Sequence, residues 1–203
     1  ARMPAPVMRR ENAQELLQQA LFLQRVANPQ IAFSTDAPKE PVHFEGERVS
    51  SSRLRLQLAA GDLDGAARAL GRRYSISGKV VRGKQLGRTL GYPTANLRLA
   101  GKRPALMGIY ATWVHGVGRE PIASVSSLGT RPTVSGIEPL LEAHLFDFDG
   151  DLYGRRIRVE FVAKLRDEEK FDGLPALVAQ MNHDAAQARR LLRHDHEHSG
   201  VTA

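Results

Sequence analysis

Ten residues with the sequence GRTLGYPTAN, at positions 87–96, combine residue types that can bind a phosphate group and a metal ion. Their two glycines let the backbone approach another group closely, because glycine has no Cβ atom. Arg88 carries a planar guanidinium whose donors match phosphate oxygens. Thr94 and Asn96 are two residues apart, so an extended backbone directs both side-chain oxygens to one face, where they can hold a hard cation.

The same residue types are also common in turns, so composition alone leaves an ordinary surface loop as the alternative. The G-x-x-x-x-G-K-[ST] signature of the Walker phosphate loop does not occur in the chain. Residue chemistry therefore indicates a phosphate or metal site here without proving one.

A series of motifs resembles the riboflavin kinase family over residues 74–194. The segment GKVVRGKQLGRTLGYPTANL at 78–97 is similar to that family's nucleotide loop, in which PTAN is the metal-binding signature. Four further segments match in the same order: GIYA at 108–111, SLGTRPTV at 127–134, LEAHLFDFDGDLYG at 141–154 and LRDEEKFDGLPALVAQMNHD at 165–184. The chain departs from the family pattern at Ser127, where N-I-G-x-R-P-T has Asn, and at Met181, where Ile is usual.

The resemblance implies an ATP-dependent kinase that phosphorylates the 5′-hydroxyl of riboflavin to give FMN. Mg²⁺ is then expected on Thr94 and Asn96, completed by phosphate oxygens and water. The residues expected to contact the nucleotide are Gly83, Gly87, Arg88, Gly91, Pro93 and His144. Arg166 and Phe171 match family positions near the isoalloxazine ring, although a surface arginine and a core phenylalanine are the alternatives.

Glu142 is the candidate general base, since it occupies the Glu of the family segment E-x-H-L. In a strand, Glu142 and His144 share one face, and the apolar residues between and beside them share the other. A glutamate is a weak base at neutral pH, but a metal ion and correct orientation can make proton removal easy. Without the resemblance, a solvated strand carboxylate is the simpler interpretation of Glu142, and His144 is expected only to support the nucleotide.

Composition excludes several classes of protein. The 203 residues are enough for one or two domains, and no apolar run approaches the ~20 residues that a membrane span requires. The chain has no cysteine, which excludes disulfides, thiolate metal sites and a cysteine nucleophile, and is compatible with the cytoplasmic location that we expect.

The formal charge of +7 and pI of about 10.1 raise nucleic-acid binding as a rival function. The arginines are dispersed along the sequence, and aromatic residues make up only 6%, which is little for base stacking. We therefore expect ATP, ADP, riboflavin and FMN as partners, with no nucleic acid and no membrane. The alternatives are a barrel that binds flavin or nucleotide without catalysis and a basic nucleic-acid-binding barrel.

Hydrophobic periodicity predicts a mainly β protein with flanking helices. Helices are expected at 11–27, from Ser50 or Ser51 to Leu58, and from an Asp62 cap to Gly71, with a loop at 28–46. The predicted strands are 75–81, 93–98, 107–115, 121–128, 139–147 and 156–164. A final helix is expected at 174–192, with Leu174, Leu177, Val178, Met181 and Ala185 on its apolar face. Six strands and one helix predict a closed antiparallel Greek-key barrel with the helix packed on it.

The first 73 residues resemble the junction in bacterial bifunctional FAD synthetases, because ERVSSSRLR at 47–55 is similar to the I-S-S-T-x-x-R segment of the adenylyltransferase module. The H-x-G-H signature of that module is absent. We expect an incomplete, helical remnant of a nucleotidyltransferase domain at 1–73, the kinase barrel at 74–194 and a disordered tail at 195–203. The sequence is expected to be incomplete at its N-terminal end, with adenylyltransferase activity only in the complete parent protein.

Overall fold

The computed structural model describes residues 43–44, 47–48, 50–83, 86–99, 104–133 and 136–199. The chain divides into two compact units, 1–54 and 55–203, so the domain boundary expected after residue 73 falls inside the second unit. The helix predicted at 11–27 lies outside the described residues. In the first unit, strand β1 (His43–Phe44) pairs antiparallel with β2 (Glu47–Arg48), so the prediction of a loop through residue 46 is wrong at β1. Strands of two residues are too short to give a periodic signal.

Two helices precede the barrel and begin where capping residues predict, although α2 ends at Ala60, two residues beyond the predicted Leu58. Helix α2 (Ser51–Ala60) follows Ser50, and helix α3 (Leu63–Leu70) follows Asp62, whose Oδ1 accepts from the Gly65 amide at 2.8 Å. Gly71 ends α3 with a φ of 67°, which a residue with a Cβ rarely adopts. Helix α3 packs against the last strand of the barrel.

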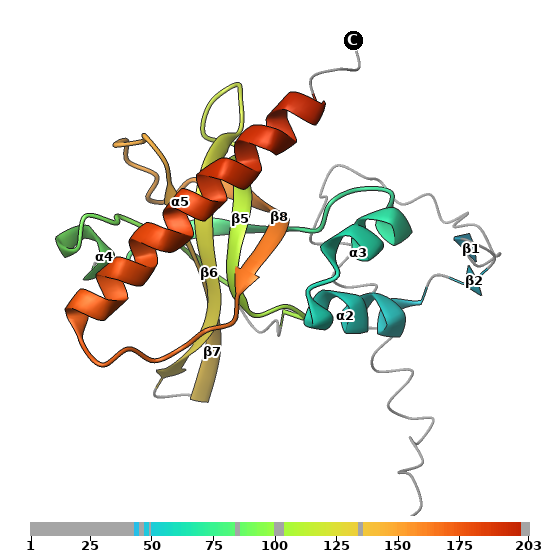
Figure 1. The fold of residues 1–203 in the computed structure, drawn as a ribbon, viewed down its shortest axis with the longest axis horizontal. Coiled ribbons are helices and arrows are strands. Elements are labelled where there is room, and N and C mark those ends of the chain that lie inside the picture. Colours follow the sequence, from blue (N-terminus) through green and yellow to red (C-terminus); the bar gives the residue numbers. More distant parts are fainter. Residues whose placement is uncertain are drawn as a thin grey trace, which may run out of the picture. The chain divides into compact units, whose positions relative to one another are not determined.

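Six antiparallel strands form a closed barrel in the order β3-β4-β7-β6-β5-β8, which confirms the predicted barrel. Figure 1 shows its strands beside the last helix. Their bounds are β3 (Ser75–Val81), β4 (Ala95–Arg98), β5 (Gly108–His115), β6 (Ile122–Thr133), β7 (Gly136–Leu145) and β8 (Arg156–Arg166). A short helix, α4 (Leu86–Thr89), lies in the connection between β3 and β4. None of the helices among the described residues is both long enough and apolar enough to cross a membrane.

Alternation along the strands fills the barrel with apolar side chains. On β8, Ile157, Val159 and Phe161 are buried between polar neighbours, and the Phe161 ring meets the Tyr110 ring edge-on at 5.2 Å. Burial raises the pKa of Tyr110 to about 12, and its hydroxyl donates to the Met107 carbonyl. Period-2 burial of this kind fixes which face of each strand points outward.

Helix α5 (Leu174–Ser199) lies across β5 and β6 on the outside of the barrel (Figure 1). Ala185, Ala188 and Leu192 pack there against Ala111 and Phe146. Leu174 was predicted on the packed face but is 56% exposed, because the helix has only just begun at that residue.

The last turns of α5 contradict the prediction of a disordered tail from residue 195, since the helix continues to Ser199. Asp195 explains the difference. Its carboxylate accepts hydrogen bonds from the Arg73 guanidinium, at 2.8 Å for Nη1, and from Trp113 Nε1, also at 2.8 Å. These partners lie 122 and 82 residues away in sequence, so local composition could not reveal them.

Candidate functional site

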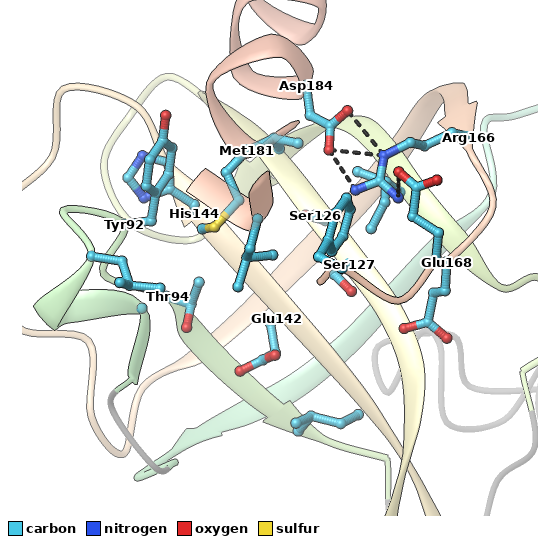
Figure 2. A pocket seen from close by; sticks show the side chains of 18 of the residues that line it. Tyr92, Thr94, Ser126, Ser127, Glu142, His144, Arg166, Glu168, Met181 and Asp184 are labelled. Carbon is cyan, nitrogen blue, oxygen red and sulfur yellow. Dashed lines mark hydrogen bonds and ion pairs between the residues drawn. The ribbon is translucent and has the colours of Figure 1, made fainter. Parts of the chain in front are cut away.

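A pocket of about 490 Å³ lies on the outer face of the barrel, where β4, β5, β6 and β7 meet α5 and the segments that follow α4 and β8. Seven of the eleven residues predicted to form a site line it: Gly87, Thr94, Asn96, Glu142, His144, Arg166 and Phe171. Figure 2 shows several of these side chains pointing into one space. Residues separated by up to 84 positions in sequence are therefore brought together.

A single row of residues crosses five adjacent strands of the barrel and lines this pocket. In the antiparallel ladders, Asn96 lies opposite Glu142, Glu142 opposite Ser127, Ser127 opposite Ile109, and Ile109 opposite Arg166. Directly opposed residues project to the same face of a sheet. All five line the pocket, so the row joins the predicted metal ligand, the predicted base and the predicted flavin-binding arginine.

Asn96 and Thr94 are in direct contact at one end of the row. Asn96 Nδ2 donates to Thr94 Oγ1 and to the Thr94 carbonyl, each at 3.2 Å. A Cβ at Gly83 would lie 2.5 Å from Asn96 Oδ1, so the glycine leaves room for this amide. Turning the amide over exchanges its oxygen and nitrogen without changing its shape, and places two oxygens side by side. As placed, the amide nitrogen faces Thr94, so a hard cation here would require the turned-over amide.

No cluster of three or more His, Cys, Asp or Glu side chains suited to a metal occurs in the part of the chain that the structure describes. A cation at Thr94 and Asn96 would therefore depend on phosphate oxygens and water for its remaining ligands. That pattern is typical of Mg²⁺, which keeps several waters and takes few protein ligands.

His144 holds the loop that precedes β4. Its Nδ1 lies 2.9 Å from the Pro93 carbonyl, which can only accept, so Nδ1 carries the proton and donates it. The ring also contacts Tyr92 at 4.9 Å and Phe146 at 5.7 Å between centroids. His144 thus positions the segment that contains Thr94.

Arg166 is fixed at the other end of the row by a buried carboxylate. Its Nε and Nη2 donate to Asp184 at 2.8–3.1 Å, and only 5% of the Asp184 side chain is exposed. Gln180 Nε2 donates to the same carboxylate at 2.9 Å. The Arg166 Cζ atom lies 5.6 Å from the centre of the Phe171 ring. A paired, oriented guanidinium beside an aromatic ring is suited to a flat polar ligand.

Glu168 adds a carboxylate at this end of the pocket. Burial raises the pKa of Glu168 above its usual value, while the positive charge of Arg166 partly opposes the shift. A Cβ at Gly129 would lie 2.0 Å from Glu168 Oε1, so a larger residue there would force the carboxylate to move.

Four predicted nucleotide-binding residues do not line the described pocket. Arg88, Gly91 and Pro93 are exposed, and Gly83 faces Asn96 instead. The pocket also contains polar or flexible residues that sequence reasoning did not assign to a site: Tyr92, Ser126, Ser127, Glu168, Glu169, Met181 and Asp184. The apolar face of the last helix indicated Met181 as a packing residue. Asp184 reaches the pocket from the same helix, and the others reach it through strand register and loop conformation.

The protein-family model described as Flavokinase: Riboflavin kinase matches residues 70–192. The chain is 46% identical over 144 residues to the bifunctional riboflavin kinase/FMN adenylyltransferase of Escherichia coli (strain K12), covering 71% of this chain and 46% of the relative. It is 44% identical over 171 residues to the protein of the same name from Pseudomonas fluorescens, covering 84% and 54%. The chain thus spans about half the length of the curated relatives it matches.

Among solved structures, a crystal structure described as a macrolide-efflux protein from Streptococcus pneumoniae is similar in fold. Its TM-score is 0.62 with 36% sequence identity, and the match covers 71% of this chain and 47% of that one. This similarity supports the barrel and helix architecture for the matched part of the chain.

Proposed function

Because the chain belongs to the riboflavin kinase family, we propose that it transfers the terminal phosphoryl group of ATP to the 5′-hydroxyl of riboflavin, giving FMN and ADP. The observation that carries this proposal is the row from Asn96 through Glu142 to Arg166. It provides, in one pocket, the three groups that the reaction needs: a metal ligand, a carboxylate for the hydroxyl proton and a fixed arginine for the flavin ring.

Glu142 receives the proton of the attacking hydroxyl in this proposal. The O–P bond to the flavin forms while the bond between the γ-phosphorus and the ADP oxygen breaks. Phosphoryl transfer passes through a loose transition state, so the position of the carboxylate matters more than its basicity. Glu142 lies on a strand of ten residues between two paired neighbours, which restricts its movement.

Thr94 and Asn96 would hold Mg²⁺ through their side-chain oxygens. When bound, Mg²⁺ neutralises charge on the β- and γ-phosphates of ATP. The carboxylates that line the pocket, Glu142, Glu168, Glu169 and Asp184, also disfavour an unscreened nucleotide, although Arg166 offsets the charge of Asp184. Gly83, Gly87, Arg88, Gly91 and Pro93 are proposed, from the family resemblance, to lie along the phosphates.

The isoalloxazine ring is proposed to bind beside Arg166 and Phe171. The apolar side chains of Ile109, Leu177 and Met181 line the same pocket and give the ring a nonpolar surface. Asp184 keeps the guanidinium in a fixed orientation, so that it does not have to be ordered when the flavin binds.

We propose that the complete protein also adenylylates FMN to FAD, as the names of the bifunctional relatives describe for those proteins. Residues 1–73 would then join the kinase module to an adenylyltransferase module. A cytoplasmic location, where ATP and riboflavin are both available, fits this role.

The test is incubation of the protein with riboflavin and Mg·ATP, followed by chromatographic separation of riboflavin, FMN and FAD. FMN without FAD is expected from this chain. Absence of FMN, with riboflavin still bound tightly, would favour a flavin-binding barrel without catalysis. Absence of both binding and product, with nucleic acid retained in a salt-dependent manner, would favour the basic nucleic-acid-binding barrel.

A further inference from the structure

Ser127 occupies the middle of the row that crosses the pocket. Glu142 is its neighbour on one side, and Ile109 is its neighbour on the other, followed by Arg166. Adjacent strands are about 4.8 Å apart, so Glu142 and Arg166, three strand spacings apart, are separated by roughly 14 Å along the row. Figure 2 shows Ser127 between Glu142 and Arg166.

The order of the row matches the order of groups in the proposed substrate. If the 5′-hydroxyl meets Glu142 and the ring meets Arg166, the ribityl chain between them must pass over β6 and β5. Ile109 offers only an apolar surface there, and the Arg166 guanidinium is committed to Asp184. Ser127 is therefore the polar member of the row that faces the middle of the substrate.

The hydroxyl of Ser127 is available for a ligand. The side chain is half-buried and lines the pocket, and within the described residues it makes no hydrogen bond. Its neighbour Ser126 is different: that side chain is 1% exposed and its Oγ lies 2.7 Å from Thr112 Oγ1 in the barrel interior. Both serines border the pocket, but the Ser126 hydroxyl is already bonded to Thr112 in the barrel interior, whereas the Ser127 hydroxyl is not bonded in this way.

We infer that Ser127 binds a hydroxyl of the ribityl chain and so helps the pocket select flavins that carry this polyol. This inference rests on the proposed function, because it takes the positions of the two substrate ends from it. A serine hydroxyl both donates and accepts, which suits a chain of alcohols whose members do the same. The family pattern has Asn at this position, which also provides a donor and an acceptor.

The test compares the binding of riboflavin and of lumiflavin, the same ring with a methyl group in place of the ribityl chain, by quenching of flavin fluorescence. Ser127→Ala is expected to weaken riboflavin binding by about 3- to 10-fold, the effect of losing one hydrogen bond, and to leave lumiflavin binding unchanged. Ser77→Ala is the matched control, because Ser77 is also half-buried on a barrel strand but does not line the pocket.

An equal effect of Ser127→Ala on both flavins, or no effect on either, would overturn the inference while leaving the kinase proposal intact. If the wild-type protein binds neither flavin and forms no FMN, the proposed function itself fails. Circular dichroism shows whether the alanine variant folds. If it does not, the binding of the same two flavins is measured with Ser127→Cys, which is expected to weaken riboflavin binding selectively. Its thiol nearly keeps the side-chain volume but is a weak hydrogen-bonding group.

Discussion

Glu142 on β7 lies directly opposite Asn96 on β4 in an antiparallel ladder. Cβ atoms of directly opposed residues are about 4.5–5.5 Å apart. The proposed base and the proposed metal ligand are therefore held at close range by two hydrogen-bonded strands, which are stiffer than loops. Since phosphoryl transfer depends mainly on positioning, this pair is the centre of the proposed chemistry.

Replacement of Glu142 by glutamine is expected to lower kcat by about 10²- to 10⁴-fold, because the amide cannot take the hydroxyl proton. The side chain keeps its size, so nucleotide binding should persist. Steady-state kinetics and ATP binding measure the two effects separately. Glu138→Gln, on the same strand but outside the pocket, is the control. A near-normal kcat for Glu142→Gln would show that Glu142 is not the general base.

Thr94→Val removes one proposed metal-ligand oxygen and keeps the shape of the side chain. We expect the Mg²⁺ concentration for half-maximal rate to rise by at least about tenfold, the lower end of what changes near a metal site cause. Thr130→Val, at an exposed position of β6, should leave that concentration unchanged. An unaltered Mg²⁺ titration in Thr94→Val would show that the threonine oxygen is not a ligand. Removal of Mg²⁺ with a chelator should abolish FMN formation in every variant.

The barrel was predictable because each strand carries its own signal. Alternation around Ile157 and Val159 fixes the buried face of β8, and the Asp62 cap and Gly71 fix the ends of α3. The length of α5 was not predictable, since its last turns are held by the contact between Asp195 and Arg73. A contact across 122 residues is a property of the folded chain and leaves no local pattern.

The sequence predicted the site residues to which the family motifs assign a role. It did not predict the residues that face the pocket only because of how the strands pair. Thr94 lies in a segment whose composition already indicates chemistry, Glu142 was assigned from the family segment E-x-H-L, and both line the pocket. Ser127 and Ile109 also lie in matched family segments, but neither residue type indicates a role in the site, and it is the pairing of β6 with β5 that brings both to the pocket. The Arg88 side chain is well suited to bind phosphate, yet it is exposed and does not line the described pocket.

Gly87→Ala is expected to raise the KM for ATP, because a Cβ at this position would lie 2.3 Å from the Tyr92 carbonyl oxygen. Backbone cannot yield as a flexible side chain can, so the turn between α4 and β4 must change shape. Gly118→Ala is the matched control, since an added Cβ there meets nothing within 4 Å. Equal ATP kinetics for the two variants would show that the conformation of this turn does not matter for the nucleotide.

Asp184→Asn should destabilise the protein by about 1–3 kcal/mol, because the Arg166 guanidinium loses its charged partner in a largely buried place. It should also raise the KM for riboflavin, since the guanidinium loses its fixed orientation. Chemical denaturation and flavin kinetics measure the two effects. Asp172→Asn, at an exposed position just before α5, should change neither. A loss of stability with an unchanged riboflavin KM would confine Arg166 to a structural role.

Asp195 makes stability depend on pH. Burial opposes ionisation, but hydrogen bonds from Arg73 and Trp113 outweigh it and hold the pKa of Asp195 below its usual 3.8. Because the native pKa is lower than the unfolded one, the carboxylate stabilises the fold above pH 3.8, and this contribution is lost as the pH falls through the native pKa. Asp195→Asn should therefore reduce the free energy of unfolding at neutral pH by about 1–2 kcal/mol, allowing for the partial exposure of Arg73.

Urea denaturation of the wild type and of Asp195→Asn at several pH values checks this dependence. The difference between the two proteins should be constant near neutral pH, should shrink as the pH falls from about 3.8 toward the native pKa of Asp195, and should be gone below that native pKa. A parallel loss for both proteins across the acidic range would assign the acid sensitivity to other carboxylates. The Arg189–Asp147 ion pair offers the comparison, since Asp147 is exposed and Asp147→Asn should have a much smaller effect at any pH.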